Sequence, residues 1–227
     1  MRTRLLTMAA VVGVVATMLP GHAATAPTAP KPQITDPAGD ANGINDQGAG
    51  AASVNVSGPV DDANADITSV LFATKYKTVT TTKTVVKIVK KKKVVTTVTV
   101  VTEVPDGFTV TMNLSAAPDG NHTYDVNATN AACGGGVDFT YSTGPTGLNE
   151  VDCTGAFDPT DPTSLLNSTT LPGEAAVVGN SVVWTIPAAA FPVGSTLSGL
   201  TAQTGTPLAL AAVDQAGDGS ASYKVGS

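Results

Sequence analysis

Seven consecutive residues, Phe108 to Leu114, alternate strictly between apolar and polar side chains, and this pattern constrains the fold more than any other feature of the chain. Neighbouring side chains of a β-strand point to opposite faces, so the alternation predicts a strand with one buried face. That face is predicted to hold Phe108, Val110, Met112 and Leu114. A turn at residues 118–121 and a second alternating run at 123–129 follow, so we expect an antiparallel pair.

Short apolar runs separated by turn residues predict the remaining strands. They lie at Ile67–Phe72, around Phe139 and Tyr141, and at Val182–Ile186, Leu197–Thr204 and Ser222–Val225. No convincing helix of three turns is expected beyond the first 24 residues. The pattern therefore predicts an all-β fold, a single antiparallel β-sandwich over residues 34–227. Trp184 shares a strand face with Val182 and Ile186, which favours a position in the core.

The segment 75–104 consists almost wholly of Thr, Val and Lys, and its second half largely repeats the residue types of its first half in reverse order. Pairing Val89 with Val94 places Val85 opposite Val98 and predicts a long β-hairpin. Its tip would hold Lys90, Lys91, Lys92 and Lys93. Neither face of this hairpin is cleanly apolar, so we expect it to project from the sandwich with a weakly specified register.

The lysines of this hairpin leave two interpretations open. A positive projection on an acidic body could contact anionic wall polymer, membrane headgroups or acidic partners through an attraction that salt weakens. Alternatively, lysines at the strand edges stop a Val/Thr-rich strand from pairing with other chains.

The first 24 residues have the pattern of a secretory signal peptide. Arg2 and Arg4 precede an apolar run from Leu5 to Leu19, and small residues follow it. The run is short for a membrane-spanning helix, which needs roughly 20 apolar residues, although a retained amphipathic anchor is the alternative. We therefore expect a secreted, extracellular protein without a membrane span, in which residues 25–33 form a Pro-rich linker.

The net charge limits the classes of binding partner that we expect, and the cysteine content bears on the bonds that form in an oxidising compartment. Without its first 24 residues the chain carries ten lysines and eighteen acidic residues, a net charge of −8, which disfavours nucleic acid as a partner. Cys133 and Cys153 are the only cysteines. Two cysteines in an oxidising compartment predict one disulfide, whereas a zinc site would also need a convincing pair of histidines. The sequence leaves the oligomeric state open.

No arrangement of residues in the sequence predicts catalysis, and we expect a protein that is not an enzyme. Beyond the signal peptide the only histidine is His122, which falls in a turn and is expected to be solvated. The glycines around Ser195 do not form a nucleophile elbow. Pairs of carboxylates for glycoside hydrolysis remain the alternative, because such residues need only meet in space.

The segment Asp36–Asp46 alternates Asp and Asn with Gly and small residues. Calcium takes six to eight oxygen ligands, and closely spaced carboxylates and amides on a flexible backbone can supply them. The spacing does not match an EF-hand. The alternative is an ordinary loop in which the Asp and Asn side chains cap turns.

The Asp36-Pro37-Ala38-Gly39-Asp40 motif, the strand opening at Asp66-Ile67 and the strand Phe108–Leu114 together resemble DOMON-like domains related to family 9 carbohydrate-binding modules. Trp184–Pro187 and Asp214–Gly217 before Tyr223 fit the same pattern, so the resemblance covers residues 33–226. It implies a secreted β-sandwich in which the opening motif contributes to a bound calcium. Asp36 and Asp40 are then the best metal candidates, followed by Asp66 and Asp214. The ribbon at 75–104 departs from the family pattern.

We therefore expect a secreted, non-catalytic binding module for an extracellular ligand such as a glycan, with calcium as a stabilising cofactor. The alternative is a structural or adhesive cell-surface protein that uses the basic hairpin to bind an anionic surface polymer. A glycan-binding surface usually needs an exposed aromatic ring, so a buried Trp184 would count against the glycan-binding module.

Overall fold

The strand that contains Phe108–Leu114 lies in the middle of a five-stranded antiparallel sheet with the order β1-β2-β3-β9-β8. The computed structural model describes residues 30–41, 62–89, 92–143, 148–154, 168–206 and 209–227. This first sheet is built from β1 (Ile34–Thr35), β2 (Ile67–Val89), β3 (Lys92–Leu114), β8 (Glu174–Val178) and β9 (Ser181–Ile186). The predicted signal peptide, most of the predicted linker, and Lys90 and Lys91 lie outside the described residues.

A second antiparallel sheet has the order β11-β10-β4-β5-β6-β7, and β12 also pairs with β10. Its strands are β4 (Thr123–Asn130), β5 (Gly135–Ser142), β6 (Asn149–Thr154), β7 (Ser168–Thr170), β10 (Thr196–Thr206), β11 (Ala209–Ala216) and β12 (Ser222–Lys224). A single 3-10 turn, η2 (Ala131–Cys133), links β4 to β5. The two sheets confirm the predicted all-β sandwich. The described residues contain no helix long and apolar enough to cross a membrane.

The inner faces of the two sheets form one apolar core. Phe108, Val110, Met112 and Leu114 are all buried, as the alternation predicts. From the other sheet, the ring of Phe139 meets Phe72 and Phe108 edge-on at 6.1 and 6.4 Å between centroids. Burial of large aromatic side chains between two sheets stabilises this fold.

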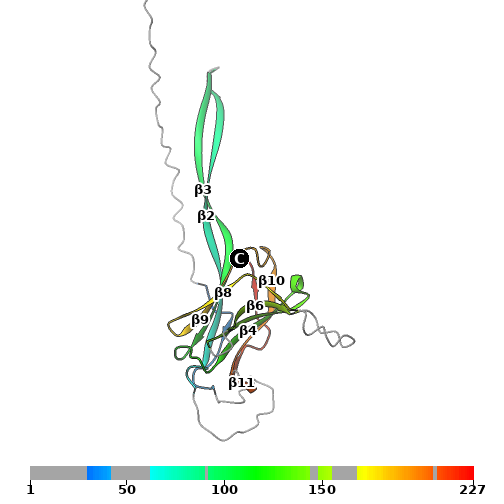
Figure 1. Cartoon of the computed structure of the whole chain (residues 1–227). Helices are drawn as coiled ribbons and strands as arrows, with labels where there is room; N and C mark the ends of the chain where they lie inside the picture. Colours follow the sequence, from blue (N-terminus) through cyan, green and yellow to red (C-terminus); the bar gives the residue numbers. More distant parts are fainter. Residues whose placement is uncertain (1–29, 42–61, 90–91, 144–147, 155–167, 207–208) are drawn as a thin grey trace, which may run out of the picture.

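Strands β2 and β3 run on beyond the sandwich as a two-stranded ribbon (Figure 1). The ribbon leaves the sheet at a β-bulge, where the pairing skips from Thr74–Phe108 to Tyr76–Pro105. The bulge needs glycine at position 107, because φ is +103° and a Cβ atom would lie 2.0 Å from the carbonyl oxygen of Ile186. The last β9 partner of β3 is this same Ile186, so the ribbon begins where the sheet ends.

The register of the ribbon differs from the one the sequence mirror predicts. Val89 pairs with Lys92 rather than with Val94, so Lys92 and Lys93 belong to strand β3 and the predicted four-lysine tip is wrong. A shift of two residues leaves every side chain on its predicted face, since faces alternate with a period of two. The repetitive Val, Thr and Lys sequence fits both registers, and the shorter turn gains two further cross-strand pairs.

Cys133 and Cys153 form the predicted disulfide across a separation of 20 residues. The bond joins η2 to β6 and so fastens the turn after β4 to a strand on the far side of β5.

Candidate functional site

The loop that follows β1 turns back on itself and brings Asp36 near Asp40. The Asp36 amide donates to the carbonyl oxygen of Thr68 at 3.0 Å, which holds the start of the loop against β2. Gly39 has a φ of +86°, a left-handed conformation that glycine adopts without strain. Its amide donates to Oδ2 of Asp66 at 2.8 Å. The Pro-Ala-Gly turn therefore sets Asp40 beside Asp36.

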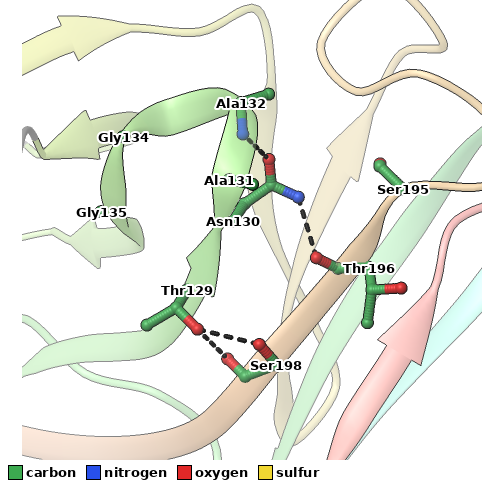
Figure 2. Close-up of a pocket in the computed structure, with 9 residues that line it drawn as sticks. All are labelled: Thr129, Asn130, Ala131, Ala132, Gly134, Gly135, Ser195, Thr196 and Ser198. Atoms are coloured by element: carbon green, nitrogen blue, oxygen red, sulfur yellow. Dashed lines mark hydrogen bonds between the residues drawn. The ribbon is translucent and has the colours of Figure 1, made fainter.

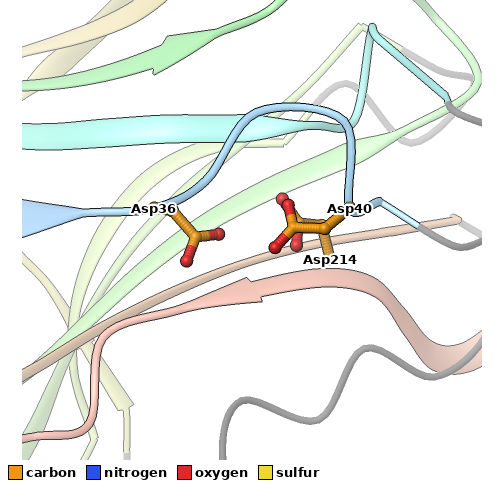
Figure 3. A group of neighbouring side chains, drawn as sticks. All are labelled: Asp36, Asp40 and Asp214. Carbon is orange, nitrogen blue, oxygen red and sulfur yellow. The ribbon is translucent and has the colours of Figure 1, made fainter.

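Asp214 of β11, which is distant in sequence from Asp36 and Asp40, completes a group of three carboxylates (Figure 3). One oxygen from each of Asp36, Asp40 and Asp214 lies within 4.8 Å of the others. Asp36 and Asp40 are half-buried, and Asp214 is fully buried. The Asp214 side chain accepts hydrogen bonds from the amides of Ile67 at 2.6 Å and Gln215 at 2.8 Å, which fix its position.

Asp66 lies beside this group and supports the loop. Its carboxylate is fully buried and accepts hydrogen bonds from the Gly39 amide and the Ser115 hydroxyl. Its Oδ1 atom has no hydrogen-bond partner among the described residues. The structure thus brings three of the four predicted metal ligands together and places the fourth at their edge.

The electrostatics of the group suit a cation. Burial raises the pKa of Asp214 to about 6, the hydrogen bond from Ile67 opposes this change, and the negative charges of Asp40 and Asp66 add to it. Converging carboxylates repel one another unless a positive charge lies between them. An all-oxygen donor set fits a hard cation such as calcium, with backbone carbonyls or water completing the coordination.

A polar pocket of about 650 Å³ adjoins the carboxylate group. Asp36 lines it together with the amide side chains of Gln33 and Gln215 and the loop residues Asp218 and Ser220. Gln33 is itself held to β2, because its Oε1 accepts from the Phe72 amide at 2.6 Å. No sequence motif points to Gln33 or Gln215, because a lone glutamine belongs to no recognisable pattern.

A second pocket lies at the far end of β4 and β10, beside the disulfide turn (Figure 2). Asn130 accepts from the Ala132 amide and donates to the Thr196 carbonyl, each at 2.9 Å. No charged or aromatic side chain lines this pocket. Its hydrogen bonds hold the turn, and we assign it no function.

Trp184 is fully buried in the core. Its indole nitrogen donates to the Thr140 carbonyl of the opposite sheet at 3.3 Å. Tyr76 at the base of the ribbon is the only exposed aromatic side chain among the described residues. The platform of exposed aromatic rings that sugar-binding surfaces commonly use is therefore not built from Trp184.

His122 lies in the predicted turn, but the expectation that it is solvated is wrong. The side chain is buried, with Nδ1 at 2.7 Å from Asp119 and Nε2 at 3.1 Å from Asp62. Burial raises the pKa of Asp119, but hydrogen bonds from the Asn121 backbone and from His122 outweigh it and leave the pKa lowered. His122 thus joins this turn to the segment that leads into Asp66.

Carboxylates also crowd the outer face of the second sheet. Asp138 and Asp152 are direct partners on β5 and β6, and Asp125 of β4 lies nearby on the same face. Burial raises the pKa of Asp138, a hydrogen bond with Thr154 opposes the change, and the Asp152 charge adds to it. Burial likewise raises the pKa of Asp125. Like charges directly opposite one another destabilise a sheet.

We expect Asp138→Asn to stabilise the protein at pH 7 by a few tenths to about 1 kcal/mol, because it removes this repulsion. A raised pKa in the folded state means that the native protein binds the proton more tightly than the unfolded chain. The wild type therefore gains stability relative to the variant as the pH falls through the raised pKa toward the unfolded value of 3.8. Urea denaturation at pH 7 and pH 4 measures the difference.

Asp218→Asn is the matched control, since hydrogen bonds from Ser220 lower the pKa of this exposed carboxylate. Its substitution should destabilise the protein slightly at pH 7, the opposite sign. A loss of stability in Asp138→Asn at pH 7 would contradict the proposed repulsion.

The basic surface of the ribbon is the remaining predicted site. Lys83, Lys87 and Lys93 are exposed on the outer half of β2 and β3. Lys77 at the base instead pairs with Asp106 at 2.6 Å. Lys90 and Lys91 lie outside the described residues, so the described basic surface on the outer half of the ribbon consists of Lys83, Lys87 and Lys93.

Comparisons with known proteins identify no relative of this chain. No family model, curated protein or solved structure matches the chain. The resemblance to DOMON-like domains therefore stays a prediction that rests on the motifs and on the sandwich.

Proposed function

We propose that this protein is a secreted, non-catalytic binding module whose β-sandwich is stabilised by calcium at Asp36, Asp40 and Asp214. One observation carries the proposal. Asp214 follows Asp36 by 178 positions and Asp40 by 174 positions in the chain, yet one carboxylate oxygen from each of the three lies within 4.8 Å of the others. Three carboxylates this close repel one another when no cation is bound. Together they suit a cation that prefers oxygen ligands.

A bound cation would fasten the N-terminal segment to the sandwich. Strand β1 consists of two residues, so its pairing with β2 holds the segment weakly. The loop from Asp36 to Asp40 leads away from β1, and Asp214 lies on β11 of the other sheet. The cation would therefore connect the two sheets at this edge and shape the adjoining polar pocket.

The polar pocket beside the cation suits a ligand rich in hydroxyl groups, such as a glycan. The amide group of Gln215 and the hydroxyl group of Ser220 can donate and accept hydrogen bonds there, whereas both ends of the Gln33 amide already bond the backbone of Phe72. Because Trp184 is buried, we propose recognition by hydrogen bonds, without ring stacking.

Carboxylates that converge could also serve glycoside hydrolysis, but the environment of this group favours a structural role. Asp214 has no exposed surface, and both of its oxygens accept backbone hydrogen bonds. A catalytic acid or nucleophile must contact its substrate. Asp214 as placed contacts backbone amides instead.

Calorimetric melting in calcium and in chelator tests the proposal. A ligand at one hundred times its dissociation constant stabilises the native state by about 2.7 kcal/mol, which raises the Tm of a domain of this size by roughly 5 to 10 °C. We expect Asp214→Asn to abolish this shift, because it removes a charged ligand while keeping the shape of the side chain.

Two controls define the outcome. Asp218→Asn changes a carboxylate of the neighbouring pocket that is not part of the group, and it should retain the calcium shift. Magnesium should produce a smaller shift, since it demands tighter octahedral geometry. Identical melting curves in calcium and chelator would refute the metal site.

The exposed ribbon supports a second candidate function, a structural or adhesive role at a cell surface. The ribbon extends past both sheets (Figure 1). Its exposed lysines lie on a body that is otherwise acidic.

A further inference from the structure

The outer half of the ribbon exposes an unusual concentration of apolar side chains. Among the described residues thirteen large hydrophobic side chains are exposed, and ten of them lie between Tyr76 and Val101. Ile88 is 79% exposed, and Val86 and Val95, which pair directly beside it, are 50% and 56% exposed. Exposed apolar groups gathered in one place mark a contact surface.

Lysines alternate with these apolar residues. Lys93 pairs with Ile88 on one face, and Lys87 pairs with Val94 on the other. The segment 75–104 holds eight of the ten lysines and only one of the eighteen acidic residues. A partner for this surface must therefore be both anionic and able to accept apolar side chains.

Two other occupants fit this surface less well. A second copy would bring like-charged ribbons together, and one face of a ribbon about 40 Å long covers only roughly 400 Å², half of what each partner in a stable interface buries. A soluble anionic polymer would satisfy the lysines but leave Ile88, Val86 and Val95 in water.

We propose that the outer ribbon binds the surface of an anionic phospholipid membrane. Ile88, Val86 and Val95 face the boundary with the acyl chains, with Lys93 on the headgroups beside them, and Lys83 and Lys87 reach the headgroups from the opposite face of the ribbon. This inference rests on the second candidate function and names its partner. Basic residues are attracted to anionic headgroups, and neighbouring apolar side chains add affinity by leaving water.

The ribbon binds at the interface without spanning the bilayer. Beyond the bulge, neither β1 nor β9 pairs with the ribbon, so the outer edges of β2 and β3 carry backbone groups without a strand partner among the described residues. Such groups are costly in hydrocarbon but satisfied by water and headgroups. The position of the bound ribbon is therefore limited to the headgroup region.

Co-sedimentation of the full chain with vesicles tests the proposal. Vesicles of phosphatidylcholine with 30% phosphatidylglycerol should bind the protein at low salt, and vesicles of phosphatidylcholine alone should not. We expect a triple variant, Lys83→Gln, Lys87→Gln and Lys93→Gln, to bind the anionic vesicles about 100-fold more weakly. A second variant, Val86→Ser, Ile88→Ser and Val95→Ser, should bind them roughly 10-fold more weakly or worse.

Matched controls separate binding from folding. Val178→Ser alters an exposed valine on β8, and Lys224→Gln alters an exposed lysine on β12, outside the ribbon, so both should bind like the wild type. Far-UV circular dichroism and the calcium response in melting should be unchanged in all variants, which keeps this test independent of the metal site.

Three results would overturn the inference. The first is absence of wild-type binding to the anionic vesicles at low salt. The second is undiminished vesicle binding in the serine variant together with lysine-dependent binding to soluble polyphosphate, which would identify a polymer partner. The third is self-association in sedimentation velocity that the serine variant abolishes, which would identify a second copy.

Discussion

Trp184→Ala should destabilise the protein by about 3 to 5 kcal/mol, the range for truncating a large buried aromatic side chain. The substitution leaves a cavity between the sheets and removes the hydrogen bond to the Thr140 carbonyl. For a domain of this size the loss lowers the Tm by roughly 6 to 20 °C. Calorimetry measures the Tm, and urea denaturation followed by circular dichroism measures the free energy of unfolding.

Two further variants test whether Trp184 acts as a core residue. Trp184→Phe keeps most of the volume but loses the indole N–H, so it should cost less than the alanine variant. Tyr76→Ala removes the exposed aromatic ring and should leave stability nearly unchanged. If Trp184→Ala melted like the wild type, the side chain would be a surface residue and an aromatic sugar platform would have to be considered again.

Removal of the disulfide should lower the free energy of unfolding by roughly 3 kcal/mol. Cys133 and Cys153 are separated by 20 residues, and closing a loop of about this length restricts the unfolded chain by that amount. The double variant Cys133→Ala and Cys153→Ala should therefore unfold at a lower urea concentration. The bond also fixes η2 against β6, so the turn after β4 should become more susceptible to proteolysis.

A reducing agent provides the control for the disulfide prediction. It should shift the unfolding midpoint of the wild type toward that of the double variant and have no effect on the variant itself. Equal stability of oxidised wild type and double variant would show that the bond does not constrain the unfolded chain.

The strands with a strong periodic pattern could be predicted from the sequence, and the weak ones could not. Phe108 to Leu114 alternate without a break, and their burial follows directly. Strand β7 has three residues, too few for a pattern, and β11 is rich in alanine, which has little preference for strands. The ribbon register was mispredicted because its repeats of Val and Thr are nearly equivalent in both alignments.

The carboxylate group was predictable in part. The Asp36 and Asp40 spacing is local, so the Gly39 turn indicates that the two side chains meet. Asp214 lies 174 residues after Asp40, and only the family resemblance indicated it as a metal ligand. Its position depends on how β11 pairs with β10. Burial of His122 escaped prediction because Asp62, which contacts it, follows no pattern that connects the two segments.

The continuity of β2 has a mechanical consequence. The strand begins at Ile67, whose amide holds Asp214, and runs without interruption to Val89 near the end of the ribbon. A pull on the ribbon therefore acts along the strand axes, and the hydrogen bonds of β2 to β1 and of β3 to β9 resist it together in shear. An anchoring contact at the far end would thus transmit tension directly to the carboxylate group, and cation binding there would strengthen the point that bears the load.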